Sequence, residues 1–175
     1  MWFFYSTFKL KFLGNEKSLN RNIIRGINFF VSIGNNSKRL DISNYIEQNQ
    51  GNLINVINRS SRISRQVTLG NGNFIAKNSC INSNTVLENN IIINTSCVVE
   101  HDCKIESGVH IGPNATICGG VTIKEGTFIG ANSIVKENTI IGENSLIGAG
   151  SVVLTNIPKN SLAYGNPCKV KDERK

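Results

Sequence analysis

The sequence is poor in large side chains and contains no apolar run long enough to cross a membrane. Aromatic residues make up 7% of its 175 residues, and it has one Met, one Trp and three Pro. This composition disfavours a helical bundle and suits a core of small and β-branched side chains. The apolar opening Met1–Phe12 is interrupted by Lys9 and Lys11, and no basic segment precedes it as in a signal peptide. We therefore expect a soluble, cytoplasmic protein with no membrane insertion.

Clustered charge and paired cysteines are also missing. Lys and Arg number 19 against 12 Asp and Glu, a net charge of +7 and a pI of about 9.3. A basic surface attracts phosphate-bearing ligands, but these cations are scattered and form no block that would follow a nucleic-acid backbone. We therefore expect no nucleic-acid partner. The five cysteines contain no CxxC pair, so reduced thiols are expected at Cys80, Cys97, Cys103, Cys118 and Cys168.

A period of six residues dominates the second half of the chain. From Val67 to Asn156 the sequence divides without a gap into fifteen hexads, from VTLGNG to SVVLTN, and every third position is Ile, Leu or Val. A period of six matches neither a long strand nor a helix, but it fits a short strand followed by a corner. Three such sides close a coil of about 18 residues. Fifteen hexads predict 15/3 = five coils, about 24 Å long at the spacing of stacked strands.

The other hexad positions support the same winding. The first is mostly small or β-branched, as an inward-facing corner requires, and the last three are rich in Gly and Asn, which tolerate the positive φ of tight corners. A β-sandwich is disfavoured because its strands vary in length and need longer connections. The prediction is a parallel β-helix in which each coil stabilises the next. Periodicity alone leaves the hand of the helix open.

The segment before the repeat predicts one α/β unit. Residues 23–34 contain a buried-strand run, Ile27–Ile33, which ends at Gly34 and is followed by Asn35. An amphipathic stretch, Lys38–Gln48, then predicts a helix. A helix that starts just after a strand can bind an anion or a nucleotide, and a packing role explains the unit equally well.

Residues 55–66 lead into the first coil, and residues 157–175 form an irregular tail that folds back over the last coils. In this tail Lys169 and Lys171 are either phosphate-binding or solvated, and solvation is the stronger interpretation for Lys171.

The chain has two histidines, and both lie in the repeat. His101 is the fifth residue of its hexad, at an outward corner beside Asp102, and His110 is the second residue of another hexad. Nine residues separate them, half of a coil, so they lie on different sides of one helix and meet only if several copies pack together. A histidine is a natural general base near neutral pH, and an adjacent carboxylate can orient its ring.

Metal and thiol chemistry are disfavoured. Two histidines cannot supply a three-histidine zinc site, and Cys97 and Cys103 occupy the same hexad position on successive sides, so their thiols diverge. Cys118 has no histidine in an evident sequence relation to it, which argues against a cysteine nucleophile. We expect no metal.

Several stretches resemble one family, the bacterial sugar O- and N-acetyltransferases that modify sialic acids and nucleotide-linked amino sugars for surface glycans. The stretches are FFVSIGNNSKR (29–39), IINTSCVVEHDCKI (92–105), VHIGPNATICGGVTI (109–123), IGAGSVV (147–153) and GNPCK (165–169). The resemblance spans roughly residues 23–170. It implies a left-handed β-helix, a homotrimer and acetyl-CoA as co-substrate, with direct transfer to a small-molecule sugar acceptor and no covalent acyl-enzyme.

The resemblance also implies roles for individual residues. His101 is the general base and Asp102 tunes it. The residues expected to contact acetyl-CoA are His110, Gly119, Ala131, Ala149 and Lys169. Asn94 matches a residue near the acceptor sugar, and Gly34 and Asn35, in the turn before the predicted helix, are expected to bind the acceptor as well.

Two positions depart from the family pattern. The family begins with a glycine-rich G-x-x-G-H-G type of turn, whereas Met1–Asn22 contains one glycine, Gly14, and no histidine; the terminal motif has Cys168 in place of Ala. We therefore expect a shortened sugar-nucleotide-binding portion at 1–54, the β-helix acyltransferase domain at 55–156 and a tail at 157–175. The alternative is a trimeric scaffold or partner subunit that retains the CoA site but binds acceptor poorly.

Overall fold

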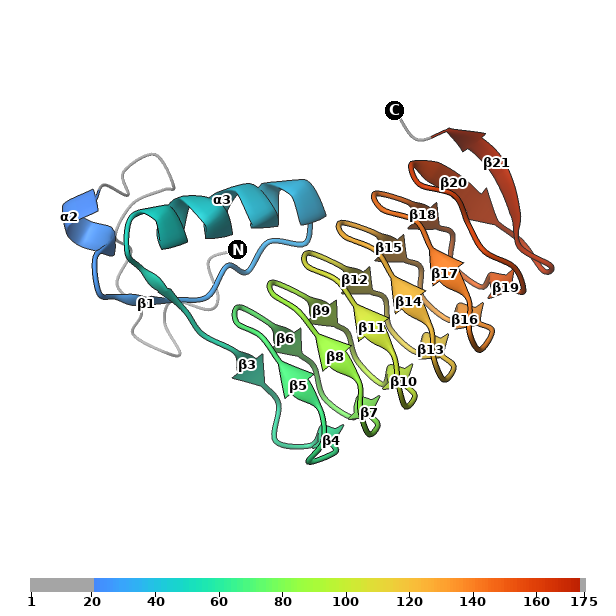
Figure 1. The fold of residues 1–175 in the computed structure, drawn as a ribbon, viewed down its shortest axis with the longest axis horizontal. Coiled ribbons are helices and arrows are strands. Elements are labelled where there is room, and N and C mark those ends of the chain that lie inside the picture. Colours follow the sequence, from blue (N-terminus) through green and yellow to red (C-terminus); the bar gives the residue numbers. More distant parts are fainter. Residues whose placement is uncertain (1–20, 174–175) are drawn as a thin grey trace, which may run out of the picture.

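The structure is a computed structural model that describes residues 21–173. A helix-bearing N-terminal unit lies at one end of a stack of short strands, and a hairpin closes the other end (Figure 1). The interpretation of Met1–Phe12 concerns residues outside the described range. None of the helices between residues 21 and 173 combines the length and hydropathy needed to cross a bilayer.

The stack is a parallel β-helix with three sheets as its sides. The eight-stranded sheet contains β3 (Val56–Ile57), β6 (Phe74–Ile75), β9 (Ile92–Ile93), β12 (His110–Ile111), β15 (Phe128–Ile129), β18 (Leu146–Ile147), β20 (Ser161–Tyr164) and β21 (Lys169–Glu173). The six-stranded sheet contains β4 (Arg62–Ile63), β7 (Cys80–Ile81), β10 (Val98–Val99), β13 (Thr116–Ile117), β16 (Ile134–Val135) and β19 (Val152–Val153). The five-stranded sheet contains β5 (Thr68–Leu69), β8 (Val86–Leu87), β11 (Lys104–Ile105), β14 (Thr122–Ile123) and β17 (Ile140–Ile141).

Strand pairing confirms the 18-residue coil. His110 pairs with Ile92 on one side and with Phe128 on the other, so each residue lies beside its equivalent one coil away. The predicted fold class, a left-handed parallel β-helix, is confirmed. The first strands are β3 and β4, two hexads before Val67. Seventeen strands from β3 to β19, at three per coil, make nearly six coils, one more than the predicted five.

The third-position column forms the core. From Ile75 to Val153 these side chains are at most 1% exposed, and burying each contributes about 1.5–3 kcal/mol. The same column is open at the first coil, where Ile57 is 44% exposed because no coil lies beneath it. The small first-position residues are buried too, as predicted for an inward corner; Cys97 and Ala115 are examples.

Positive backbone φ angles recur at the corners, where Asn and Gly were predicted to permit them. One corner carries Asn84 (φ 60°), Asp102 (58°), Gly120 (69°) and Asn138 (57°), one residue per coil. Asp102 is the unusual member, because Asn and Gly adopt this conformation more readily. The chain thus uses an aspartate at one place in an otherwise Asn/Gly column.

The N-terminal unit is a small βαβ arrangement that begins with α2 (Arg21–Ile24). Strands β1 (Asn28–Phe29) and β2 (Asn52–Leu53) pair in parallel, and α3 (Asn36–Gln48) connects them. The predicted strand Ile27–Ile33 is correct in place but too long, because the chain after Phe29 leaves the sheet and crosses to the β-helix, where the ring of Phe30 lies 6.0 Å from that of Phe74. The helix starts two residues earlier than predicted, since the Asn35 side chain caps it by accepting a hydrogen bond from the Lys38 amide (2.9 Å).

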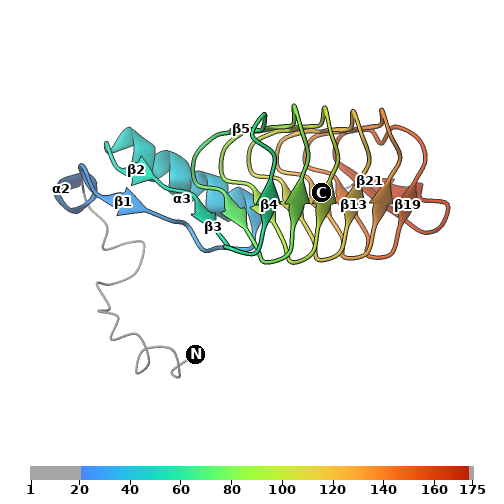
Figure 2. The ribbon, with the colours of Figure 1, turned by 90° about the horizontal axis from the view of Figure 1, so that it is seen from below.

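Helix α3 lies along the corner that leads into the eight-stranded sheet (Figures 1 and 2). Leu40 packs over Gly108, where an added Cβ would lie 2.5 Å from its Cδ1. At the far end, β20 pairs in parallel with β18, and β21 returns antiparallel to β20. The tail therefore folds over the last coil, as expected, but as an ordered hairpin rather than an irregular segment.

Candidate active site

His101 lies at the corner between β10 and β11. Its side chain is exposed, and its Nδ1 lies 2.8 Å from Oδ2 of Asp102. The other Asp102 oxygen accepts a hydrogen bond from Asn84 Nδ2 (3.2 Å), one coil earlier. The hydrogen bond from His101, and then that from Asn84, hold the pKa of Asp102 below its ordinary value. An ionised Asp102 accepts a hydrogen bond from Nδ1–H of His101, which leaves the unprotonated Nε2 as the base.

Gly119 lies under the His101 ring, one coil later. A Cβ on Gly119 would lie 2.7 Å from Cε1 and 2.9 Å from Nε2 of His101. The backbones are also joined, because the Gly120 amide donates to the His101 carbonyl (2.9 Å). The predicted residues His101, Asp102 and Gly119 therefore form one group, which we call the His101 corner.

The thiols near this corner are poor nucleophiles. Cys103, two residues after His101, is buried, and this burial raises the pKa of its thiol to about 11. Burial, followed by the nearby Glu137 and Glu100 carboxylates, also raises the pKa of Cys118. Both thiols are therefore protonated near neutral pH, whereas thiol chemistry requires the thiolate.

A second group of predicted residues lines a cavity on the eight-stranded sheet. The cavity has a volume of about 240 Å³. One wall is the segment 30–34, including Gly34, and the other is the sheet, with Asn94 and His110. Asn94 Nδ2 lies 3.4 Å from His110 Nε2, and the His110 ring meets Phe128 edge-on at 4.8 Å. We call this the His110 pocket.

His110 differs from His101 in its surroundings. Its Nδ1 is buried without a hydrogen-bond partner of good geometry. Burial lowers the pKa of His110, the nearby Gly34 backbone opposes this, and the Arg39 cation lowers the pKa further. His110 is therefore a neutral imidazole near pH 7, with one ring nitrogen as a hydrogen-bond donor and the other as an acceptor.

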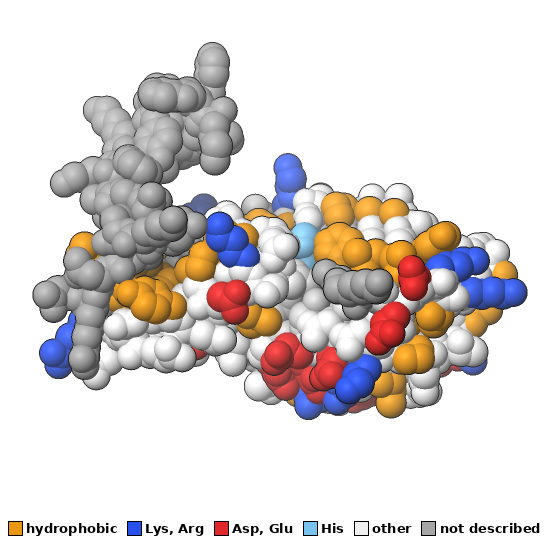
Figure 3. Space-filling model, turned by 90° about the horizontal axis from the view of Figure 1, so that it is seen from above, with side chains coloured by type: hydrophobic (Ala, Val, Ile, Leu, Met, Phe, Trp, Pro, Cys, Tyr) orange, Lys and Arg blue, Asp and Glu red, His pale blue; other side chains and the backbone are white. Residues whose placement is uncertain are grey.

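The turn Gly34–Asn35 separates the His110 pocket from a second cavity. This cavity, of about 190 Å³, is lined by Gly34, Asn35, Asn36, Phe128 and Leu146. The two cavities share Gly34 and lie at the start of α3. Figure 3 shows hydrophobic side chains gathered on this face of the molecule.

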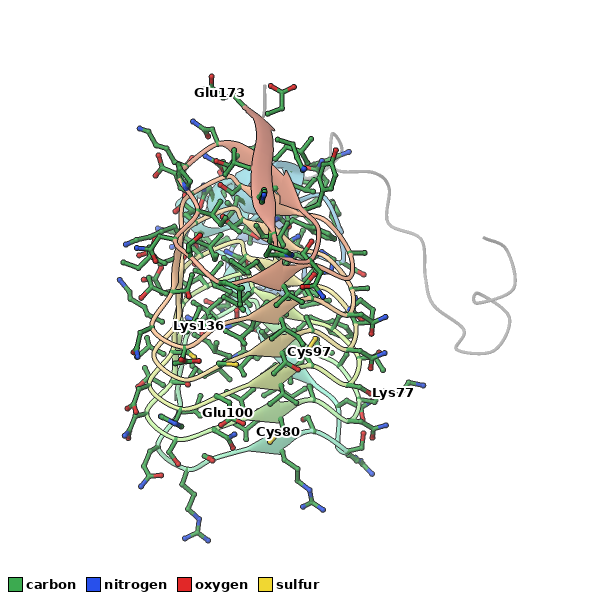
Figure 4. All side chains as sticks on the ribbon, turned by 90° about the vertical axis from the view of Figure 1, so that its right-hand side faces the viewer. Lys77, Cys80, Cys97, Glu100, Lys136 and Glu173 are labelled. Carbon is green, nitrogen blue, oxygen red and sulfur yellow. The ribbon has the colours of Figure 1, made fainter. Side chains whose placement is uncertain are left out.

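The remaining predicted residues lie on another corner and in the tail. Ala131 and Ala149 are 18 residues apart and stack at the corner that leaves the eight-stranded sheet, where the Gly150 amide donates to the Ala131 carbonyl (2.8 Å). Lys77 belongs to the same column and lies opposite Glu100 and Lys136, which mark the His101 corner (Figure 4). Lys169 is exposed at the start of β21, where it pairs with Tyr164.

One chain therefore brings the predicted residues together in separate groups. His101 follows β10 of the six-stranded sheet, whereas His110 lies in β12 of the eight-stranded sheet, so they occupy different sides, as their spacing predicted. Sequence analysis missed Arg39, which is 1% exposed and donates hydrogen bonds beside the His110 pocket. The signal available was the helical spacing of Arg39 from Ile42 and Ile46, which puts the arginine on their side of the helix, close to Gly34.

Residues 21–173 contain no cluster of three or more His, Cys, Asp or Glu side chains able to hold a metal ion. The His101 corner can carry out proton transfer, because its imidazole is exposed and is oriented by Asp102.

Comparison with known proteins gives a family and several similar structures. The model of the bacterial transferase hexapeptide family (six repeats) matches residues 84–119 and 120–155. Perosamine N-acetyltransferase from Caulobacter crescentus, solved in complex with CoA and GDP-perosamine, is 34% identical with a TM-score of 0.82; the match covers 83% of this chain and 70% of that one. A comparison with curated proteins finds no match.

Two further structures are similar over comparable lengths. The acetyltransferase domain of PglB from Neisseria gonorrhoeae, in complex with acetyl coenzyme A, is 28% identical with a TM-score of 0.82, covering 89% of this chain and 75% of that one. WeeI from Acinetobacter baumannii is 26% identical with a TM-score of 0.77, covering 82% and 70%.

Proposed function

The chain belongs to the bacterial hexapeptide transferase family, and from this membership we propose that it transfers an acetyl group from acetyl-CoA to a sugar. The acceptor we propose is an amino group of a nucleotide-linked amino sugar, with a sugar hydroxyl as the alternative nucleophile. The observation that carries the proposal is the His101 corner, where an exposed imidazole is oriented by Asp102 and lies over Gly119. The similarity to a perosamine N-acetyltransferase supports nitrogen over oxygen as the attacking atom.

His101 is the general base of the proposed reaction. Asp102 fixes Nδ1 as the protonated nitrogen, so Nε2 takes a proton from the acceptor amine as it attacks the thioester carbonyl. Backbone N–H groups stabilise the tetrahedral oxyanion. The C–S bond then breaks, and the departing thiolate leaves as CoA after protonation by the histidinium. The two substrates react directly in a ternary complex, so no acyl-enzyme is required.

The complete site is proposed to form between subunits of a homotrimer. His101 and His110 lie on different sides of one chain, so packing of one side against a different side of a neighbouring chain would bring the two groups together. The short side chains at the Ala131–Ala149 corner suit the passage of an extended pantetheine chain, and Lys169 is exposed for a phosphate contact. His110 would contact the thioester region, and acetyl-CoA would supply the activated acyl group.

This arrangement gives each part of the chain a separate role in the proposed reaction. Residues 55–156 would provide the acyl-transfer machinery, and residues 157–175 would close the end of the β-helix. Residues 1–54 would contribute the acceptor side, with Gly34 and Asn35 beside the His110 pocket and Asn94 on the facing wall. The proposed role of the reaction is modification of sugars for surface glycans.

The test is calorimetric titration of the purified protein with acetyl-CoA, followed by turnover on a panel of nucleotide-linked amino sugars and sialic acids. Acetyl-CoA binding with acetylation of one sugar supports the proposal and names the acceptor. Acetyl-CoA binding without acetylation of any sugar favours the scaffold alternative. Absence of acetyl-CoA binding contradicts both.

A further inference from the structure

Arg39, on α3, is buried without a carboxylate among its described hydrogen-bond partners. Its side chain is 1% exposed, and burial lowers the pKa of Arg39 to about 10, so it remains a cation near neutral pH. Its described acceptors are four backbone carbonyls and one side-chain amide oxygen. A buried charge is costly unless its hydrogen bonds are satisfied, and here neutral oxygens on three separate chain segments satisfy them.

Two of these acceptors line the His110 pocket, and two precede the strands that form its other wall. Nη1 donates to the carbonyls of Ile33 (2.9 Å) and Gly34 (3.3 Å), which belong to the wall contributed by the N-terminal unit. Nε donates to the Asn90 carbonyl (2.9 Å) and Nη2 to the Gly108 carbonyl (2.8 Å). One guanidinium therefore joins both walls.

The carbonyls of Asn90 and Gly108 lie just before the two strands that carry the β-helix wall of the pocket, β9 and β12. Asn90 precedes β9, which leads to Asn94, and Gly108 precedes β12, which starts with His110. They are 18 residues apart and occupy the same corner in successive coils. Arg39 thus sets the position of the loop at Gly34 against the strands that carry Asn94 and His110.

Asn36 extends the same contact to a third coil. Its Oδ1 accepts from Arg39 Nη2 (2.9 Å), while its Nδ2 donates to the carbonyls of Gly126 (2.9 Å) and Thr127 (3.2 Å). These residues precede Phe128, which meets the His110 ring. Three consecutive coils are therefore tied to the start of α3 by two side chains.

We propose that Arg39 is a positioning residue for the acceptor side of the site, which fixes the width of the His110 pocket by joining the Gly34 loop to the turns before β9 and β12. This inference rests on the proposed function for its catalytic consequence, while its structural content is independent of any substrate. This role requires the five N–H donors of a guanidinium, because the three donors of a lysine ammonium cannot bind all four of these backbone carbonyls.

The experiment compares Arg39→Gln and Arg39→Lys with Arg25→Gln, which removes an exposed cation from the same N-terminal unit. The first measurement is NMR titration of the two histidine rings in the purified protein without ligands. In Arg39→Gln the His110 midpoint should move upward, because a nearby cation is lost and the pocket opens, while the His101 resonance stays unchanged. Arg25→Gln should leave both resonances unchanged.

The second measurement separates positioning from folding through steady-state kinetics with the sugar that wild-type protein acetylates. Arg39→Lys, which keeps the charge, should retain the fold and raise the acceptor KM about tenfold, with a smaller effect on the KM for acetyl-CoA. Unchanged His110 resonances together with an unchanged acceptor KM would overturn the proposal. So would losses in thermal stability, acetyl-CoA KM and acceptor KM that run in parallel, since these indicate a purely structural arginine. A wild-type protein that acetylates no sugar would contradict the proposed function, and the NMR titration would still decide the role of Arg39.

Discussion

The imidazole of His101 lies directly over Gly119, its equivalent one coil later. The space it occupies is the space that a Cβ at position 119 would need, 2.7 Å from Cε1. Gly119 has an ordinary negative φ, so its backbone does not require glycine. The glycine is therefore explained by the histidine above it, which links a backbone position to the proposed base.

Gly119→Ala should leave the fold intact and displace the His101 ring. The new methyl group meets the flexible end of a side chain rather than backbone, so thermal stability should change little. The rate of acetyl transfer should fall about ten- to a hundredfold, as for a catalytic group displaced by about 1 Å. Ser83→Ala, at the same corner two coils before Gly119, is the control in kinetic assays. Equal activity of both variants would show that ring placement by Gly119 is unimportant.

Asp102→Asn removes the carboxylate and keeps a residue that tolerates the left-handed backbone (φ 58°) at this corner. The variant should fold normally, because the side chain is exposed. The kcat should fall by at least tenfold, since the amide can no longer hold Nδ1–H against an anionic acceptor. Kinetics over a range of pH checks this, and a kcat equal to that of wild type at every pH would contradict the orienting role.

His110 should make the stability of the protein sensitive to mild acid. Burial first, and the Arg39 cation after it, lower the pKa of His110 in the folded state below its ordinary value near 6.5. The unfolded chain then binds a proton more readily, so stability is full above that value and falls as pH drops through the interval down to the folded pKa. His110→Gln should reduce this slope in thermal unfolding scans. Identical slopes in wild type and His110→Gln would refute the prediction.

A larger side chain at the Ala131–Ala149 corner should obstruct acetyl-CoA. Ala149→Leu places a bulky group on an exposed corner, so the β-helix should fold as before. The KM for acetyl-CoA should rise about tenfold or more, with a smaller effect on acceptor KM. Lys77→Leu is the matched control, because position 77 belongs to the same column four coils before Ala149. If Lys77→Leu raised the acetyl-CoA KM as strongly as Ala149→Leu, the proposed path of the pantetheine would be wrong.

The β-helix could be predicted from the sequence because the third residue of every hexad from Val67 to Asn156 is aliphatic. The aliphatic third position gave the coil length and the buried column, which the pairing of His110 with Ile92 and Phe128 confirms. The same pattern continues upstream at Ile57 and Ile63, the third positions of two further hexads within the segment expected to lead into the first coil. Their exposed and half-buried side chains belong to the open end of the stack, where the polar neighbours Arg59, Ser60 and Arg62 weaken the pattern.

The candidate site could be predicted only in part. The His101–Asp102 contact follows from adjacent residues, and its relation to Gly119 follows from the 18-residue period. The junction between α3 and the β-helix could not be derived, because Arg39 meets Gly108 and Asn90 across 69 and 51 residues of sequence. Nor does any periodic pattern distinguish an arginine that donates to carbonyls from one exposed to solvent.

Acetyl transfer with His101 as the general base is the central claim, and mass spectrometry of the reaction products tests it most directly. Purified wild-type protein and His101→Asn are incubated with acetyl-CoA and the panel of nucleotide-linked amino sugars, after both are shown to have the same oligomeric state. Wild-type protein should give a singly acetylated sugar and free CoA, and His101→Asn should give the same products at a rate lower by about 10²–10⁴-fold. Acetylation by His101→Asn at the wild-type rate would contradict the account.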